Sequence, residues 1–202
     1  MIEIKKLNKS FGDKTLFQDF NESIKDGEFV IFSGKSGCGK TTLLNMIGAL
    51  EKPDGGHILV GGKDIHARKN QAEYFKNIVG FLFQNFALVE NKTVRKNLEL
   101  VQKKQRTEIT IEEALRRVGL LEKAETPVYQ LSGGEQQRIA LARLMVKKCE
   151  IILADEPTGS LDSQNADEVL KILKQMNRQG KTVILVTHDE KIINSGERVI
   201  RL

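Results

Sequence analysis

Short apolar runs alternate with longer amphipathic stretches along most of this chain. Several runs carry apolar residues at successive positions, a pattern typical of strands that are buried on both faces of a parallel sheet. The four runs are Glu28 to Gly34, Ile78 to Gln84, Ile151 to Pro157 and Thr182 to His188. Because helical stretches separate them, the pattern predicts an α/β fold with a mainly parallel sheet covered by helices.

The N-terminal segments have a different pattern. Ile2 to Leu7 and Phe17 to Ile24 alternate between apolar and polar residues, as does "GHILVGGKDI" further along. Such alternation is typical of antiparallel strands with one solvated face. We therefore expect these segments at an edge or in an antiparallel side sheet.

Helical periodicity replaces the strand pattern between Phe86 and Lys148. The stretches "TVRKNLELV", "TIEEALRRVGL" and "EQQRIALARLMVKK" carry it, and the last predicts a helix from Glu135 to Lys147. An inserted helical subdomain is the simplest interpretation. We predict one domain over 1–202, with its core at about 1–84 and 146–202 and the helical subdomain at about 85–145.

Composition adds few constraints. A chain of 202 residues with 40% hydrophobic content can bury the core of a single globular domain. The net charge of +5 would suit a nucleotide, nucleic acid or anionic membrane, although a solvated basic surface explains it equally well. The basic runs are short, lack interleaved aromatics and match no nucleic-acid-binding module, so nucleic acid is not the expected partner.

Cysteine usage and hydropathy point to the cytosol. The two cysteines have neither disulfide nor metal-ligand spacing, which favours a reducing compartment. The N-terminus lacks the apolar core of a signal peptide, and no apolar run approaches the ~18 residues of a membrane span. A soluble cytoplasmic chain is expected.

The strongest chemical signal is "GKSGCGKTT", which fits the phosphate-binding pattern G-x-x-x-x-G-K-[ST]. It follows a predicted strand and opens a predicted helix, and this context weakens the alternative of a chance glycine-rich turn. Backbone N–H groups and the helix N-terminus would face phosphate oxygens. Lys40 would reach the β- and γ-phosphates, Thr41 would offer a hydroxyl to Mg²⁺, and Cys38 would contribute its backbone N–H. The predicted phosphate-binding residues are Gly34, Lys35, Ser36, Gly37, Cys38, Gly39, Lys40, Thr41 and Thr42.

A bound Mg-nucleotide needs an acidic partner for the metal, and "IILADEP" offers one. Its buried strand ends in Asp155, at the sheet edge where α/β proteins bind ligands. We assign Asp155 to Mg²⁺, directly or through water, and Glu156 as the base that polarises the attacking water. Taken alone, an Asp-Glu pair would more often cap a loop; the phosphate-binding pattern reverses that preference.

Two further polar residues end predicted strands at the same edge. Gln84 closes "IVGFLFQ" and His188 closes "TVILVTH". His188 could contact the γ-phosphate and hold the water and Glu156, while Gln84 could sense metal and water. A simple strand-end hydrogen bond remains the alternative for Gln84. The predicted catalytic set is Lys40, Gln84, Glu156 and His188, and the predicted metal set is Thr41, Gln84 and Asp155.

Together these stretches resemble the ATP-binding subunit of an ABC transporter. The resemblance rests on "GKSGCGKTT", Gln84, "LSGGEQQR", "IILADEP", "SLD" at Ser160 to Asp162 and "THD" at Thr187 to Asp189, and it covers essentially the whole chain. "NFALVENKTVRKNLEL" and "DEPTGSLD" are similar to the branch of macrolide exporters and lipoprotein-releasing ATPases, and most closely to lactococcin-type bacteriocin export or immunity ATPases. The resemblance implies a P-loop NTPase (RecA-like) core with an antiparallel β side sheet and an inserted α-helical subdomain.

The resemblance also implies how ATP is held. An aromatic residue upstream of the P-loop stacks on adenine in the family, and Phe11 matches that position, where tyrosine is frequent. Phenylalanine keeps the π face that stacking needs. A core position is the alternative for Phe11. No reader of the base edge is evident, so we expect modest selectivity for ATP over GTP.

Two such domains are expected to pair head to tail around two ATP molecules, as a homodimer or with a related ATPase. The resemblance implies that Ser132, the N–H groups of Gly133 and Gly134 and the following helix N-terminus bind the partner's γ-phosphate. Glu135 belongs to the same signature and is placed with the nucleotide-binding residues. Asp162 would communicate across the interface.

Finally, the resemblance implies a separate integral membrane permease. The ATPase would lie peripherally on the cytoplasmic face of the membrane and drive export of a peptide, bacteriocin or other hydrophobic compound. The segment Gln84 to Asn97, with exposed apolar side chains at Phe86 and Leu88, is the expected dock. Two alternatives stay open: a regulatory ABC ATPase coupled to a membrane protein without transport, and a soluble ABC ATPase acting on nucleic acid.

Overall fold

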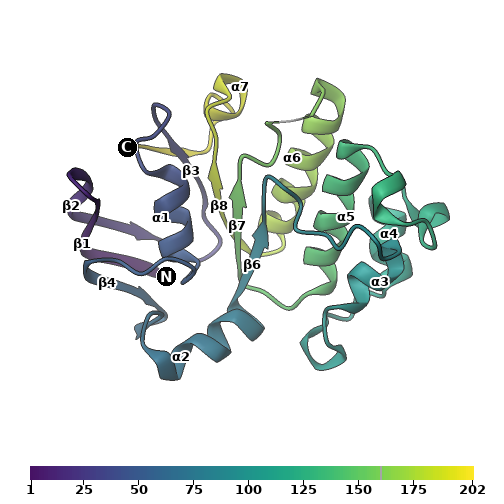
Figure 1. The fold of residues 1–202 in the computed structure, drawn as a ribbon, viewed down its shortest axis with the longest axis horizontal. Helices are drawn as coiled ribbons and strands as arrows, with labels where there is room; N and C mark the ends of the chain where they lie inside the picture. Colours follow the sequence, from purple (N-terminus) through teal and green to yellow (C-terminus); the bar gives the residue numbers. More distant parts are fainter. Residues whose placement is uncertain (160) are drawn as a thin grey trace.

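A computed structural model describes residues 1–159 and 161–202 of the chain, so Ser160 of the "SLD" stretch lies outside the described residues. The strands form two sheets. A four-stranded antiparallel sheet has the order β2-β1-β4-β5, and a five-stranded parallel sheet has the order β6-β7-β8-β3-β9. Figure 1 shows α1 between the two sheets, with α5 and α6 on the other side of the parallel sheet. The predicted α/β fold is confirmed.

The parallel sheet contains all four predicted buried strands. Its strands are β3 (Phe29–Ser33), β6 (Val79–Leu82), β7 (Ile151–Asp155), β8 (Thr182–Val186) and β9 (Arg198–Arg201). The edge strand β9 was missed because "RVIR" has two charged ends and is only half buried. Strands β6 and β8 also end earlier than expected, so Gln84 and His188 each follow their strand by two residues.

Successive residues of these strands face different cores, which explains their unbroken apolar runs. In β3, Val30 and Phe32 pack with β1 and α1, whereas Ile31 packs with the helices on the opposite side. Strand β7 divides in the same way, with Leu153 on the first side and Ile152 on the second. A polar residue at any of these positions would be buried without a hydrogen-bond partner.

The antiparallel sheet matches the alternating N-terminal segments. Its strands are β1 (Ile2–Phe11), β2 (Lys14–Ile24), β4 (Gly55–Val60) and β5 (Lys63–Asp64). Both β1 and β2 are longer than predicted, and several register shifts interrupt their pairing. These irregularities hide the simple alternation beyond Leu7. The longer β1 carries Phe11 to the end of the sheet, at the hairpin that leads into β2.

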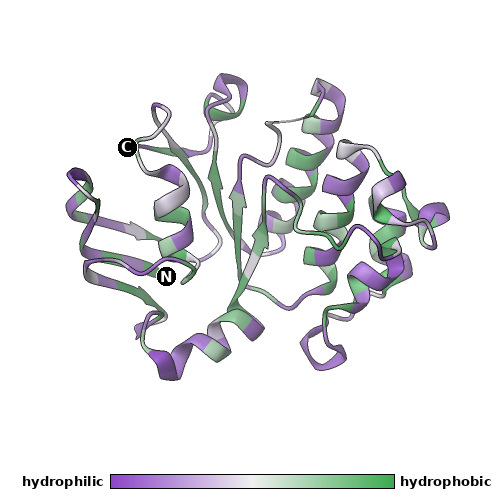
Figure 2. Ribbon diagram, in the orientation of Figure 1, coloured by the Kyte–Doolittle hydropathy of each residue, from purple (hydrophilic) through white to green (hydrophobic). Residues whose placement is uncertain are grey.

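The helices cover the parallel sheet. They are α1 (Lys40–Ile47), α2 (Arg68–Glu73), α3 (Val94–Glu99), α4 (Ile111–Arg117), α5 (Gly133–Val146), α6 (Ser163–Arg178) and α7 (Glu190–Ile193). A π-helical turn (Tyr74–Ile78) joins α2 to β6, and 3₁₀ turns occupy 103–105, 121–123 and 128–130. In Figure 2 the strands of the parallel sheet are coloured mainly as hydrophobic, whereas the helices mix hydrophobic and hydrophilic residues. None of the helices in the described part of the chain has the length and apolarity to cross a membrane.

Two details of the helical region differ from expectation. Helix α5 begins at Gly133 and ends at Val146, so the two glycines form its first turn instead of preceding it. The predicted start at Glu135 was wrong because Ser132 caps the helix, and a cap allows the first turn to contain poor helix formers. Helices α3, α4 and α5 pack on one another; the subdomain limits of 85–145 stay a prediction.

Candidate functional site

The predicted phosphate-binding stretch is the loop between β3 and α1. Gly39 is the N-cap of α1 with a φ of 103°, and a Cβ there would lie 3.0 Å from the Phe17 ring. Glycine is needed for both reasons. The Nζ of Lys40 donates hydrogen bonds to the carbonyl oxygens of Gly34 (2.9 Å) and Lys35 (3.0 Å). The loop therefore surrounds the ammonium group whose predicted role is to contact phosphate.

Lys14, which sequence reasoning missed, also contacts this loop. Its Nζ donates to the carbonyl oxygen of Gly37 at 2.8 Å. The residue begins β2, in the neighbouring sheet, and no motif marks it. Only the packing of one sheet against the other brings this second ammonium group to the loop.

Two of the three predicted metal ligands, Thr41 and Asp155, meet at the start of α1. The hydroxyl of Thr41 donates to Asp155 Oδ1 at 3.0 Å, although the residues are 114 apart in sequence. Burial raises the pKa of Asp155, and the nearby Glu156 charge adds to this, whereas the Thr41 hydrogen bond opposes it. A half-buried carboxylate beside a hydroxyl suits a hard divalent cation. These residues therefore fit Mg²⁺.

Glu156 and His188 also meet. Glu156 follows β7, and its backbone N–H donates to the Val186 carbonyl at the end of β8, which aligns the two strand ends. His188 Nδ1 lies 2.8 Å from Glu156 Oε1. Glu156 Oε2 is buried and has no hydrogen-bond partner among the described residues. With its φ of 42°, Glu156 also has a strained backbone, which is frequent at functional sites.

Gln84 lies in a turn after β6 and not at the strand end. A Cβ added to Gly159 would be 3.9 Å from Gln84 Nε2, so the amide lies beside the turn that follows Glu156. Gln84 and Asp155 line a common hollow of about 770 Å³ with Gly133, the first residue of α5. The fold thus brings the P-loop neighbourhood, Gln84 and the signature helix to one region.

Phe11 is not a core residue. Phe11 is 52% exposed at the end of β1, so part of its surface is open to a stacking partner. The Nζ of Lys9 lies 4.8 Å from the ring centroid. Lys9 itself is buried and forms ion pairs with Glu51 and Asp54, which fix it in place. Sequence reasoning missed Lys9, because the alternation in β1 predicts which face of the sheet the residue lies on but not its contact with the Phe11 ring.

The signature stretch forms a capping box at the N-terminus of α5. The Ser132 hydroxyl accepts a hydrogen bond from the Glu135 N–H at 3.3 Å, and the Ser132 N–H donates to Glu135 Oε2 at 2.9 Å. Glu135 also forms an ion pair with Lys123, which is the main cause of its lowered pKa. The Glu135 carboxylate is therefore engaged within its own chain. Gly133 remains exposed, whereas Gly134 is buried.

Gly134 is close to the residue that holds Asp162. A Cβ on Gly134 would lie 2.7 Å from the Asn165 side chain. Asp162 caps α6 by accepting from the Asn165 backbone N–H (2.9 Å) and side-chain amide (2.6 Å), and Arg138 of α5 donates to Asn165 as well. Sequence reasoning missed Arg138 and Asn165. They link the signature helix to Asp162.

The predicted docking segment is less exposed than expected. Phe86 and Leu88 are half buried and pack against the helical core, which corrects the expectation of exposed side chains. The exposed apolar residues of this neighbourhood are Val89 (41%) and Leu50 (50%). The backbone turns at Phe86 and Ala87, which have positive φ values. Phe86 packs against the helical core, whereas Val89 is exposed to solvent.

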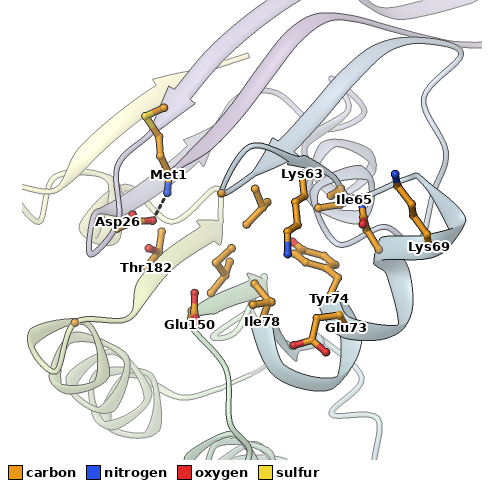
Figure 3. A pocket seen from close by; sticks show the side chains of 15 residues that line it. Met1, Asp26, Lys63, Ile65, Lys69, Glu73, Tyr74, Ile78, Glu150 and Thr182 are labelled. Carbon is orange, nitrogen blue, oxygen red and sulfur yellow. Dashed lines mark hydrogen bonds and ion pairs between the residues drawn. The ribbon is translucent and has the colours of Figure 1, made fainter.

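A second cavity, of about 530 Å³, lies at the opposite end of the parallel sheet (Figure 3). Its lining mixes apolar side chains with the carboxylates of Glu73 and Glu150 and the amine of Lys63. None of the predicted site residues lines it, within the described part of the chain. The predicted chemistry is therefore concentrated at the carboxyl ends of the strands.

Comparison with known proteins agrees with this geometry. The family model described as ABC transporter matches residues 17–159. The chain belongs to the ABC transporter family. Its residues fit the ATP and Mg²⁺ of this ATPase family: a P-loop lysine, a Thr41–Asp155 corner, and Glu156 paired with His188.

Among its relatives are the macrolide export ATP-binding/permease proteins MacB. That of Aggregatibacter actinomycetemcomitans is 39% identical and that of Vibrio parahaemolyticus 38%; each match covers 100% of this chain and 33% of the relative. The chain thus spans about a third of the length of these ABC transporter relatives.

Solved ABC transporter cassettes have the same fold. The dimeric structure of MJ0796, a bacterial ABC transporter cassette, has a TM-score of 0.88 and 37% identity, covering 100% of this chain and 94% of that one. A second MJ0796 structure, a dimeric post-hydrolysis state bound to ADP and Pi, has a TM-score of 0.86 and 34% identity with the same coverage.

Proposed function

We propose that this chain binds MgATP at the P-loop and hydrolyses it. The observation that carries the proposal is the pairing of Glu156 with His188 close to the Thr41–Asp155 corner. Bound Mg²⁺ would neutralise phosphate charge, with Thr41, Asp155 and Gln84 as its candidate ligands, directly or through water. Lys40 would exchange its two carbonyl contacts for phosphate oxygens.

Glu156 is the proposed base for the attacking water. Its Oε2 atom is buried without a partner among the described residues, so it has a free lone pair for a water proton. Its other oxygen is fixed by His188 at 2.8 Å. His188 is 74% exposed and can therefore reach a phosphate on the open side of the loop. Phe11, which is 52% exposed, is the proposed adenine platform.

The proposed active form is a dimer in which each signature stretch completes the partner's ATP site. MJ0796 cassettes form dimers, which supports the same assembly for this relative of 37% identity. Ser132 and the exposed Gly133 N–H at the start of α5 would then provide an anion site for the phosphate that the partner's P-loop holds. Asp162, held by Asn165, would contact the partner near this point.

We further propose that the ATPase acts with an integral membrane permease and lies on its cytoplasmic face. The MacB relatives are export ATP-binding/permease proteins, and this chain matches a third of their length. The hollow beside Leu50, Phe83 and Phe86, together with exposed Val89, is the candidate dock. A peptide, bacteriocin or other hydrophobic compound is the proposed cargo class.

The test is a Mg²⁺-dependent ATPase assay on the wild type and on Glu156→Gln. The variant keeps the shape of the side chain but removes the base, so turnover should fall by about 10²- to 10⁴-fold while ATP binding persists. Size-exclusion chromatography with saturating ATP should then detect a trapped dimer.

Glu150→Gln is the matched control, because Glu150 lies at the opposite end of β7 in the second cavity. It should hydrolyse ATP at the wild-type rate. A Glu156→Gln protein that retains wild-type turnover would refute the base assignment. A wild type without Mg²⁺-dependent turnover in any dimeric form would refute the ATPase proposal itself.

A further inference from the structure

Arg143 connects the signature helix to the turn that contains Gln84. It lies on the last turns of α5, and its guanidinium donates to the carbonyl oxygens of Phe86 (3.0 Å) and Ala87 (2.6 Å). Among the described residues no carboxylate pairs with it, and burial lowers the pKa of the guanidinium. A guanidinium in this setting is held by backbone carbonyls alone, so its position is tied to that of the turn.

The two carbonyls belong to a strained backbone. Phe86 and Ala87 have φ values of 60° and 48°, so two consecutive residues with side chains are in the left-handed region. Such residues persist only where the surroundings hold them. Arg143 is suited to this, because its planar fork can donate to two neighbouring carbonyls at once.

The next part of the segment is fixed separately. The fully buried side chain of Asn97 accepts from the Val89 N–H (2.7 Å) and donates to the Val89 carbonyl (3.0 Å). Asn97 therefore anchors the end of the turn near the candidate dock, whereas Arg143 anchors the end near Gln84. Of these two anchors, only Arg143 comes from the helix that carries the signature.

Helix α5 connects the signature stretch to Arg143 as one continuous helix. Gly133, at its first position, and Arg143 are ten residues apart, or about 15 Å along the axis. A displacement of the helix N-terminus would move the guanidinium, and with it the two carbonyls that follow Gln84 by two and three residues. No loop intervenes between the two ends of the helix.

We propose that Arg143 is a positioning residue: it holds the strained turn that places Gln84 beside the metal corner, and it couples this turn to the signature end of α5. The inference deepens the proposed ATPase function and rests on the role of Gln84 proposed there. It predicts a defect in the placement of Gln84 and not in ATP binding by the P-loop.

The first test is hydrogen exchange of the nucleotide-free protein for Arg143→Met and Arg143→Lys. The amides of Phe86 and Ala87 donate within the turn, at 3.0 Å to Phe83 and 2.6 Å to Asn85. In Arg143→Met, a peptide covering 83–90 should exchange faster by about tenfold or more, because local opening becomes easier, while peptides of the P-loop keep wild-type exchange. Lysine, with one point charge, should give an intermediate rate.

The second test measures hydrolysis. Arg143→Met should bind ATP within about twofold of the wild type, yet lose about 10- to 100-fold in kcat, the loss expected from misplacing a site group by about 1 Å. Its half-maximal Mg²⁺ concentration should rise, as it should in Gln84→Ala. Arg116→Met is the control, since Arg116 is an exposed residue of α4 that pairs only with Glu113 among the described residues.

The outcomes separate the two proposals. Wild-type exchange at 83–90 in Arg143→Met, or faster exchange across the P-loop as well, would overturn the positioning role. So would a Gln84→Ala defect that Arg143→Met does not share. An inactive wild type would overturn the ATPase proposal, while the exchange comparison would still decide whether Arg143 holds the turn.

Discussion

The P-loop and the signature stretch each present a helix N-terminus on the nucleotide side of the fold, but the two ends are built differently. Helix α1 has Gly39 as its N-cap, with no side-chain cap among the described residues and no acidic residue in its first turn. Helix α5 has Ser132 as its N-cap, with a full capping box and an acidic first turn. The first N–H groups of α1 are left for a ligand, whereas some of the first N–H groups of α5 are satisfied by its own capping box.

This difference has an energetic reason. An uncapped helix end costs stability until an anion satisfies it, and a loop that wraps the anion within one chain can tolerate that cost. In the proposed dimer the signature end would meet its phosphate only on another molecule, and its cap would keep α5 ordered until then. Glu135 places a negative charge there, and Lys123 neutralises it. We infer that the P-loop half governs affinity and the signature half governs turnover.

The largest expected effect comes from the P-loop half. Lys40→Ala removes an ammonium group that would make two contacts with phosphate oxygens. At about 1.5 kcal/mol each, their loss should weaken ATP binding by about 100-fold. Equilibrium binding of a fluorescent ATP analogue measures this. Lys69→Ala, at an exposed lysine of α2 beside the second cavity, is the control; equal losses in both variants would contradict a specific role for Lys40.

The signature half should respond in the opposite way. Ser132→Ala should leave ATP affinity within about twofold but lower kcat by about tenfold, the effect of about 1.4 kcal/mol from one lost contact to the partner's phosphate. Steady-state kinetics at several protein concentrations separate the two quantities.

Thr110→Ala is the matched control for Ser132→Ala. Thr110 caps α4 by the same contact with the N–H three residues on, so it carries the same capping loss of about 1 kcal/mol. Its kcat should be that of the wild type. A similar decrease in both variants would mean that capping, and not contact with the partner, explains Ser132.

Phe11 offers a smaller effect on affinity. Phe11→Ala should raise KM for ATP about fivefold with kcat unchanged, taking about 1 kcal/mol for a stack that is open on one side. Phe11→Tyr should stay within about twofold. A KM that is equal in all three proteins would exclude stacking at this ring.

The smallest effect concerns the metal corner and pH. Burial raises the pKa of Asp155, so the folded protein holds this proton more tightly than the unfolded chain does. Stability should therefore fall as pH rises from about the ordinary value of 3.8 through the raised pKa. Asp155→Asn keeps an acceptor for Thr41 and removes the titration. Without Mg²⁺ it should melt at a higher temperature than the wild type at pH 7.

Asp167→Asn, on the exposed face of α6, is the control for Asp155→Asn and should leave the melting temperature unchanged. With Mg²⁺ and ATP the order should reverse, because the wild-type carboxylate gains its cation. An Asp155→Asn protein less stable than the wild type at pH 7 and equally stable at pH 4 would contradict a raised pKa for Asp155.

Strands buried on both faces were easy to predict because every position is apolar, as in "VILV" of β8. Strand β9 was hard, since it lies at the sheet edge and its ends are charged. The start of α5 was misplaced by two residues because a capping box outweighs the low helix propensity of glycine. Gln84 was assigned to a strand end, although the strand stops at Leu82 and a turn with left-handed residues follows.

Local chemistry in this protein is determined by the sequence itself. "GKSGCGKTT" specifies a phosphate loop, and apolar runs that end in Asp155 and His188 specify which sheet edge carries polar groups, because both depend on contacts between residues near in sequence. The tertiary structure alone decided the rest: the approach of Lys14, the support of Phe11 by Lys9, and the hold of Arg143 on Phe86 and Ala87. These contacts depend on how the segments pack in space, and no local pattern encodes the packing that creates them.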